Sequence, residues 1–347
     1  MTQTRGYAVL SAKAPLVPYE FQRRELGAND VGFEIDFSGI CHSDIHQARE
    51  EWGEALFPMV PGHEIVGTVT KVGKSASKFK VGDKIGVGVF IDSCRECENC
   101  TRGLQQYCLE GMTGTYNGYE RNSQTIAFGG YSNNFVINED YAVHIPTNLD
   151  LAGVAPLLCA GITLYSPIRH WKVGRGSKVA VMGLGGLGHM GVKFAAALGA
   201  EVTVLSHSPS KENDAKAMGA EHFVVTKEKD WHLPLKKKFD LVLNTVSADL
   251  ELEPYLSTLA TDGTLVIIGL PGKPYSFSAG SMLDGRRSIA GSMIGGMPEL
   301  QEMMNFCGEH NIVSDVEVID PTYINAAYER TVASDVKYRF VIDAKKF

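Results

Sequence analysis

Long apolar runs, blocks of like charge and low-complexity stretches are all missing from this chain of 347 residues. No run of about 18 uninterrupted apolar residues occurs, so neither a membrane-spanning helix nor a membrane partner is expected. The formal net charge is −7 and the densest cationic patch is only LKKKFD at 235–240, which disfavours a nucleic acid partner. The sequence MTQTRGYAVL lacks the apolar core of a signal peptide, and we expect a cytoplasmic protein.

Cysteine is scarce and odd in number, with seven residues, which argues against a framework of disulfides in a reducing compartment. Four of the seven follow the spacing C-x2-C-x2-C-x7-C within CRECENCTRGLQQYC. Four thiolates enclose Zn²⁺ tetrahedrally and leave no open position, so the predicted site is structural. A bacterial iron–sulfur run closes with a shorter gap and a proline, which makes that alternative weaker, and four unliganded thiols are the other alternative. The predicted ligands are Cys94, Cys97, Cys100 and Cys108.

The other three cysteines lie in different surroundings. Cys307 recurs at helical spacing with apolar neighbours in PELQEMMNFCGEH, and we expect it to be a core residue. Cys41 in GICHSDIH, His63 in PGHEIVG and Cys159 in LLCAGITLY each lie beside glycine or at an element boundary. Two thiolates and one imidazole would leave a fourth zinc position open, as in catalytic sites. Spacing alone leaves ordinary core packing of these three residues as an alternative.

The pattern of secondary structure changes near residue 150, and the length of the chain also favours two domains. Before that point, short β-like runs alternate with glycine turns, which predicts an all-β, barrel-like lobe. From Lys178 onward, apolar strands alternate with helices, which predicts a doubly wound parallel sheet. The tail YRFVIDAKKF is β-like again, and we expect it to rejoin the first lobe.

The first turn of the second region reads GLGGLG, matches G-x-G-x-x-G, and lies between a predicted strand and a predicted helix. In that context the motif indicates dinucleotide binding, because glycine permits a tight turn, close approach to a pyrophosphate and helix–strand packing. The helix N-terminus would face the phosphates. A glycine-rich turn without a ligand is the alternative. The predicted cofactor-binding residues of this turn are Gly183, Gly185, Gly186, Leu187 and Gly188.

Strand EVTVL ends in SHSPSK, where an NAD-specific site would carry an acidic residue for the ribose 2′-hydroxyl. Ser206, His207, Ser208 and Lys211 instead offer hydroxyl donors and positive charge, which suit a 2′-phosphate. NADP(H) is therefore the predicted cofactor. Ser208 could alternatively cap the helix that begins at Pro209, and the two roles are compatible.

Taken together, these motifs resemble the zinc-dependent medium-chain alcohol dehydrogenases, close to the cinnamyl alcohol dehydrogenase branch and bacterial aldehyde reductases. The resemblance runs through GICHSDIH, PGHEIVG, the four-cysteine lobe, GGYSNN, LLCAGITLYSP, GLGGLGH and GSMIGG. It implies an α/β protein with a Rossmann domain at 154–291 and a GroES-like β-rich catalytic domain formed by 1–153 and 292–347. The structural zinc lobe would occupy about 92–110. A homodimer or homotetramer is also implied, with two Zn²⁺ per subunit.

The same resemblance implies roles around a catalytic zinc held by Cys41, His63 and Cys159. Ser43 would pass a proton through the cofactor ribose to His46 and solvent; a loop-capping serine and a surface histidine are the alternatives. Two carboxylates have implied roles next to that zinc. Asp44 would orient His63, or form a salt bridge with an arginine. Glu64 matches a carboxylate near the zinc, with an ordinary ion pair as its alternative.

Thr163 matches a family position that touches the nicotinamide. His189 is expected to be an exposed helix residue rather than a ligand. Trp52, Met293 and Ile294 match pocket-lining neighbourhoods, and core packing is the alternative for each.

Gly114 stands where plant cinnamyl enzymes commonly have Trp, so we expect a wide pocket and broad reduction of primary aldehydes. The predicted reaction is the interconversion of primary alcohols and aldehydes by hydride transfer with NADP(H). A zinc-independent quinone or enone reductase of the same fold and a non-enzymatic, zinc- and nucleotide-binding redox sensor are the alternatives.

Overall fold

The computed structural model describes residues 2–347, which form two compact units. The first unit comprises the described chain up to Ile162 together with Gly295–Phe347, and the second is Thr163–Ile294. The sequence placed the divisions after residues 153 and 291. The earlier of these falls inside α3 (Leu151–Val154), whose helical turn is N-capped by the Asp150 side chain. The chain therefore continues through α3 before the second unit begins.

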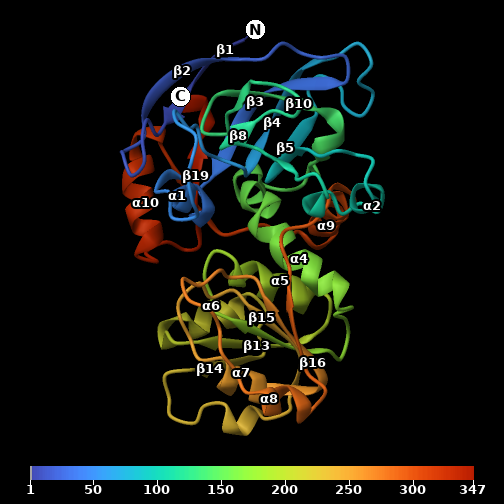
Figure 1. Cartoon of the computed structure of the whole chain (residues 1–347), viewed down its shortest axis with the longest axis vertical. Helices are drawn as coiled ribbons and strands as arrows, with labels where there is room; N and C mark the ends of the chain where they lie inside the picture. Colours follow the sequence, from blue (N-terminus) through green and yellow to red (C-terminus); the bar gives the residue numbers. More distant parts are fainter. Residues whose placement is uncertain (1) are drawn as a thin grey trace. The chain divides into compact units, whose positions relative to one another are not determined.

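Strand β3 (Asp30–Gly39) organises the main sheet of the first unit, and β4 (Ile65–Val72), β10 (Asn134–Asn138) and β19 (Arg339–Asp343) pair with it. The sheet order is β11-β5-β4-β3-β19-β18, and Figure 1 shows β3, β4 and β5 side by side. Since β19 lies within YRFVIDAKKF, the expected return of the tail to the first lobe is confirmed. The other strands of this unit are β1 (Thr2–Ala8), β2 (Val17–Arg23), β5 (Lys84–Val87), β6 (Phe90–Asp92), β7 (Thr113–Gly114), β8 (Gly118–Tyr119), β9 (Ile126–Ala127), β11 (Val143–His144) and β18 (Val316–Ile319).

Helices also belong to the first unit, so the expectation of an all-β lobe is wrong in this respect. Helix α1 (His42–Ala48) begins directly after β3, and its start is fixed because the Cys41 N–H donates to the Asp44 carboxylate at 2.9 Å. Cys307 lies on α9 (Met297–His310) and is fully buried, which confirms its predicted place in the core. The further helices are α2 (Glu98–Thr101), α3, the short 3₁₀ helix η3 (Ala155–Leu158) and α10 (Ile324–Val332). Helix α4 (Ala160–His170) begins in this unit, and its residues from Thr163 onward belong to the second.

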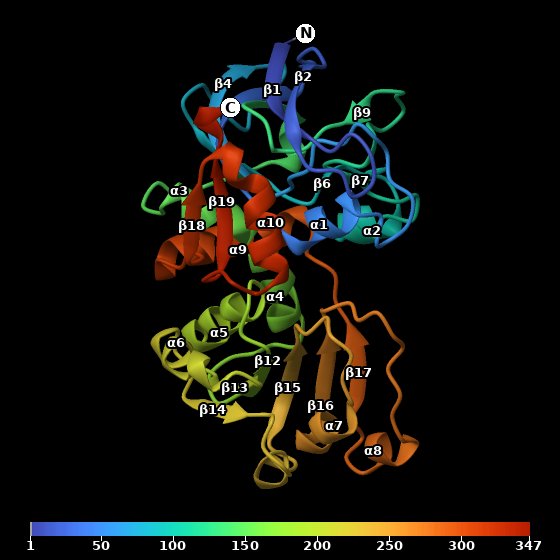
Figure 2. The same cartoon turned by 90° about the vertical axis from the view of Figure 1, so that its left-hand side faces the viewer.

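The second unit contains a parallel sheet of six strands in the order β14-β13-β12-β15-β16-β17. This is the strand order typical of dinucleotide-binding sheets, and it confirms the predicted doubly wound fold. Figure 2 shows β15, β16 and β17 side by side. The strands are β12 (Lys178–Met182), β13 (Glu201–Ser206), β14 (His222–Val225), β15 (Phe239–Asn244), β16 (Leu259–Ile267) and β17 (Ser288–Gly291). The helices are α5 (Gly188–Ala197), α6 (Glu212–Ala217), α7 (Glu253–Thr258) and α8 (Ala279–Leu283).

The central strand β12 explains why the second region reads as continuous apolar runs. Four successive residues after Lys178 are buried, because a strand inside a parallel sheet is covered on both faces.

Among residues 2–347, no single helix is long and apolar enough to cross a membrane. The bent pair Leu151–Leu158 and Ala160–His170, which meet at 58°, reaches that length and composition only in combination.

Candidate active site and metal centres

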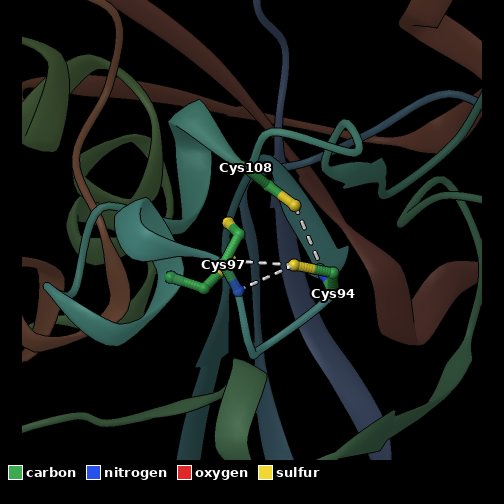
Figure 3. A group of neighbouring side chains, drawn as sticks. Cys94, Cys97 and Cys108 are labelled. Carbon is green, nitrogen blue, oxygen red and sulfur yellow. Dashed lines mark hydrogen bonds between the residues drawn. The ribbon is translucent and has the colours of Figure 1, made fainter.

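The four-cysteine lobe brings its sulfur atoms around one point. The Sγ atoms of Cys94, Cys97, Cys100 and Cys108 all lie within 4.8 Å of one another. Backbone amides point at three of them: Cys97 N–H donates to Cys94 at 3.3 Å, Cys94 N–H to Cys108 at 3.4 Å and Leu109 N–H to Cys97 at 3.4 Å. Figure 3 labels Cys94, Cys97 and Cys108 and shows the bonds of this set that involve Cys94. Such amide bonds stabilise thiolates, which are the metal-binding form of cysteine.

The spacing of these sulfurs fits a zinc ion. Two sulfurs bound to Zn²⁺ at about 2.3 Å in a tetrahedron lie roughly 3.8 Å apart. The Sγ atoms of Cys94 and Cys100 are 3.8 Å apart. Cys100 also lies 3.1 Å from the hydroxyl of Ser93, which bonds to the Tyr141 hydroxyl at 2.7 Å. The predicted set of four ligands is therefore assembled for one ion with no ligand position left over.

A second cluster gathers residues that lie far apart in the sequence. Cys41 caps α1, His63 precedes β4, and Cys159 lies between η3 and α4. Ligand atoms of these three residues and of Glu64 all lie within 4.8 Å of one another, and all four residues are buried. The Sγ atoms of Cys41 and Cys159 are 3.9 Å apart, again close to the separation in a tetrahedral zinc site.

His63 gives the clearest test of whether a metal fits this cluster. Its Nδ1 bonds to the Asp44 carboxylate at 3.0 Å, whereas its Nε2 is buried with no hydrogen-bond partner among residues 2–347. An unpaired buried nitrogen is unfavourable unless something else binds it. Since ligand atoms of His63 and of the two cysteines lie within 4.8 Å of one another, a zinc ion between them would satisfy all three groups and leave a fourth position for another ligand.

The ionisable groups of this cluster shift one another's pKa values. The hydrogen bond from the Cys159 thiol lowers the pKa of Cys41 well below its ordinary value, and the Arg339 guanidinium acts in the same direction. That bond raises the pKa of Cys159, so the pair readily shares one negative charge. Burial opposes a charge on His63, but the Asp44 carboxylate outweighs it and raises the pKa of His63.

Two carboxylates near the cluster have different partners. Among residues 2–347, Asp44 bonds to His63 and not to an arginine, so its contact is the one expected for a residue that orients the ring. Glu64 pairs with Arg339 and also lies within the cluster, so both expected settings of Glu64 coexist. Burial raises the pKa of Glu64 to about 8, although Arg339 opposes this shift. The Oε2 atom of Glu64 has no hydrogen-bond partner in the described chain.

Helix α1 carries Ser43 and His46 on one face, three residues apart. Ser43 Oγ lies 3.5 Å from Cys41 Sγ, and His46 Nδ1 bonds to the Glu51 carboxylate. The His46 ring stacks on Trp52 with ring centroids 4.7 Å apart. Trp52 is 46% exposed, so the core-packing alternative does not describe it.

In the second unit, the glycine turn has the shape that a dinucleotide phosphate requires. Gly183 has a φ of 84°, and a Cβ on Gly188 would lie 2.0 Å from the Gly183 carbonyl oxygen. A Cβ on Gly185 would meet no described atom within 4 Å, so the backbone there is open to a ligand. The turn, which includes Gly186 and Leu187, leads into the N-terminus of the ten-residue helix α5. Phosphate binding is favoured at such a helix start.

The residues expected around a 2′-phosphate lie at the end of β13. Ser206 ends that strand, and its Oγ accepts a hydrogen bond from the Ser208 N–H at 3.2 Å. Ser208 stands at the N-cap of the 3₁₀ turn Pro209–Lys211 without a side-chain capping bond, which weakens the capping alternative. His207 is exposed. Lys211 reaches back to the glycine turn and donates to the Leu184 carbonyl at 2.8 Å.

Three further expectations concern the second unit. His189 is fully buried, with its Nδ1 3.1 Å from the Gly185 carbonyl oxygen, so its predicted exposure is wrong. The reason is that most residues of α5 are buried, and a polar side chain there must bond to backbone. Thr163 is buried in α4. Met293 is 43% exposed and Ile294 7% exposed, so core packing describes only Ile294.

Several residues around the cluster of Cys41, His63 and Cys159 are not predicted from the sequence. Arg339 lies in the β-like tail and reaches Glu64. Tyr131 donates to Asp44 at 3.1 Å, and Tyr116 stacks on His63 with centroids 5.8 Å apart. GGYSNN had marked the segment that contains Tyr131 as part of the resemblance, but no local pattern connected it to the cluster.

Comparison with known proteins agrees with this geometry. The alcohol dehydrogenase GroES-like domain matches residues 27–147, and the zinc-binding dehydrogenase domain matches residues 186–309. The chain is 54% identical to NADP-dependent alcohol dehydrogenase C 1 of Mycolicibacterium smegmatis over 99% of this chain and 98% of that protein. It is 50% identical to aldehyde reductase YahK of Escherichia coli over 98% of this chain and 97% of that protein.

A solved structure of CAD from Helicobacter pylori complexed with NADP(H) is 41% identical, with a TM-score of 0.93 and 99% of both chains covered. The first match lies within the first unit, and the second covers most of the second unit and continues to residue 309 of the first. The ligand sets of two metal sites are assembled in the first unit. The chain therefore belongs to the zinc-dependent medium-chain alcohol dehydrogenase family, as its motifs had indicated.

Proposed function

We propose that this enzyme interconverts primary alcohols and aldehydes by hydride transfer with NADP(H), and that it acts as a broad-range aldehyde reductase. The observation that carries the proposal is the convergence of Cys41, His63 and Cys159, together with a buried Nε2 of His63 that has no hydrogen-bond partner among residues 2–347. Relatives named as NADP-dependent alcohol dehydrogenase and aldehyde reductase support the reaction and the cofactor. The intact ligand set does not favour a zinc-independent reductase, and the named activities do not favour a sensor without catalysis.

Cys41, His63 and Cys159 would hold the catalytic zinc, and Asp44 would fix the His63 ring so that Nε2 faces the ion. Bound there, zinc supplies a Lewis acid for the substrate oxygen, and NADP(H) donates or accepts the hydride. Glu64, held by Arg339, would set the charge next to this site. The four-cysteine cluster would hold a second zinc with a structural role.

Aldehyde reduction consumes a hydride and one proton, so the site needs a route by which a proton reaches the substrate oxygen. Ser43 Oγ lies 3.5 Å from the Sγ atom of Cys41, which supports a role for its hydroxyl beside the proposed zinc site. We assign proton transfer to Ser43 Oγ and to the ring of His46 on the same face of α1. Glu51, bonded at His46 Nδ1, would hold that ring in place.

For the cofactor, the glycine turn would bind the pyrophosphate, and the residues at the end of β13 would bind the 2′-phosphate. Lys211 supplies positive charge next to the turn. Thr163 would contact the nicotinamide. The residues proposed for the cofactor are Thr163, Gly183, Gly185, Gly186, Leu187, Gly188, Ser206, His207, Ser208 and Lys211.

Trp52, Met293 and Ile294 would line an apolar substrate pocket, and Gly114 would leave that pocket wide. In the described part of the chain, a Cβ at Gly114 would meet only the Tyr116 carbonyl oxygen within 4 Å, at 3.2 Å, so no bulky described neighbour occupies the space of the missing side chain. We further propose that the enzyme works in the cytoplasm as a homodimer or homotetramer. The abundance of metal-binding thiols supports a reducing compartment.

Zinc content and turnover of matched cysteine variants test this function. We expect the wild-type protein to hold about two zinc ions per chain and to reduce a panel of primary aldehydes with NADPH. Cys41→Ala should hold about one zinc, keep its circular dichroism spectrum and lose turnover. The control is Cys307→Ala, a buried cysteine outside both clusters, which should keep both ions and activity. Turnover in Cys41→Ala, or fewer than two ions in the wild type, would contradict the proposal.

A further inference from the structure

The segment Phe128–Ser132 is held firmly against the loop that carries His63. Arg23 is buried and its guanidinium donates to the Phe128 carbonyl, to the Gly129 carbonyl at 2.7 Å and to the Ser132 hydroxyl at 2.9 Å. The amides of this segment bond in turn to the loop before His63: Gly130 N–H donates to the Gly62 carbonyl at 2.9 Å, and Tyr131 N–H to the Pro61 carbonyl at 2.9 Å. These bonds fix the backbone of Tyr131 beside the His63 loop.

From that position, Tyr131 completes the hydrogen bonding of Asp44. The Asp44 carboxylate is fully buried and accepts the Cys41 N–H at 2.9 Å, the Gly62 N–H at 3.1 Å, His63 Nδ1 at 3.0 Å and the Tyr131 hydroxyl at 3.1 Å. A carboxylate has about four acceptor positions, so all of them are used. Two of the four donors belong to predicted zinc ligands, and Tyr131 supplies the side-chain donor that does not.

The Tyr131 hydroxyl is itself positioned by a second tyrosine. Tyr328 on α10 donates to it at 3.4 Å, and the two rings meet edge to face with centroids 6.4 Å apart. Figures 1 and 2 both show α10 beside α1, the helix that carries Asp44. Burial raises the pKa of Tyr131 well above its ordinary value, so the hydroxyl keeps the proton that it donates.

We propose that Tyr131 is a positioning residue of the catalytic zinc site, acting through Asp44 to hold the His63 ring in the orientation that binds the ion. The inference rests on the zinc site of the proposed function. Without the hydroxyl, Oδ2 of Asp44 keeps the Cys41 amide but loses the Tyr131 donor, and the carboxylate is less firmly held where it bonds to His63. Mutation of a residue that hydrogen-bonds to a metal ligand typically changes metal affinity 10- to 100-fold. Tyr131 is one hydrogen bond further from the ligand His63 than Asp44 is.

The rate of zinc transfer to a chelator tests the proposal independently of turnover. Tyr131→Phe keeps the ring and removes the hydroxyl, and we expect the catalytic zinc to leave roughly tenfold faster while the structural zinc leaves at the wild-type rate. Comparison with Cys41→Ala, which should lack the catalytic ion, assigns the two kinetic phases. With cobalt(II) in the catalytic position, Tyr131→Phe should also shift the visible absorption of the ion, which a general loss of stability would not do.

Tyr141→Phe is the matched control. It removes another buried tyrosine hydroxyl of the same unit, the one bonded to Ser93 beside the four-cysteine cluster, and should leave the catalytic zinc phase unchanged. Tyr328→Phe removes only the outer hydroxyl and should accelerate the same phase less than Tyr131→Phe does. It also serves as the test variant if Tyr131→Phe does not fold.

A double-mutant cycle separates action through Asp44 from a general packing effect. In an Asp44→Asn background, the Tyr131→Phe effect on zinc release should fall to less than twofold. Wild-type release rates and an unchanged cobalt spectrum in Tyr131→Phe, faster loss of both ions, or a full effect in the Asp44→Asn background would overturn the proposal. A wild-type protein with one zinc would instead refute the proposed function, so the two failures are distinguishable.

Discussion

Replacing Arg339 by Met is the most direct test of how the charges around the catalytic cluster are balanced. Arg339 and Glu64 are both buried, and the guanidinium bonds to Glu64 Oε1 and to the Ile40 carbonyl at 2.9 Å. Methionine keeps much of the apolar volume of the side chain but removes its charge and its donors. Glu64 would then lie in the interior without its cation, and the Ile40 carbonyl would lose this partner.

The expected effect is large because removing one member of a buried ion pair leaves the other either charged without its partner or forced to take up a proton. Such a change typically costs about 3–5 kcal/mol of unfolding free energy. For a unit of this size, each kcal/mol lowers the Tm by about 2–4 °C, so we expect a decrease of roughly 6–20 °C. Replacing both partners, as in Arg339→Met with Glu64→Leu, should recover at least half of the loss, since an apolar pair of similar volume is often tolerated.

Differential scanning calorimetry of the zinc-loaded protein measures this shift. Arg102→Met is the control: it breaks an exposed pair with Glu98 in the same unit, where the N–O distance is 3.3 Å. Exposed pairs of this kind contribute about 1 kcal/mol or less, so the control should lower the Tm by only a few degrees. If Arg339→Met shifts the Tm no more than Arg102→Met, the argument that this pair balances buried charge is refuted.

The parts of the fold that could be predicted are those whose sequence pattern lies within one short stretch of the chain. Strand β12 and helix α5 follow from an apolar run, a glycine turn and an alanine-rich segment, and the structure has both in the expected order. Helix α1 was missed because its seven residues are too few to show a hydrophobic period, and its start depends on Asp44 capping the Cys41 amide. The predicted exposure of His189 is wrong, because α5 is buried on several sides by residues that are distant in the sequence. A short stretch of sequence does not show such packing.

The candidate site divides in the same way. The four-cysteine cluster is local, because its ligands lie within one short loop, and spacing was enough to predict it. The second cluster joins Cys41 to Cys159, which are 118 residues apart, so spacing alone could not distinguish ligands from core residues. Arg339 and Tyr131 reach their partners across 275 and 87 residues. Only the packed fold reveals such contacts, because no sequence motif indicates which residue Arg339 or Tyr131 contacts.

Two further predictions concern the cofactor and the core. Ser206→Asp places a carboxylate where the 2′-phosphate should bind, so steady-state kinetics should show KM rising at least tenfold for NADPH but not for NADH; equal changes would contradict the assignment. Burial raises the pKa of Cys307 from 9.0 to about 12, so iodoacetamide should label it at pH 9 only after unfolding. Because the unfolded chain loses this proton first, Cys307 makes the protein less stable between pH 9 and 12, and urea titrations should show a shallower decline in Cys307→Ala.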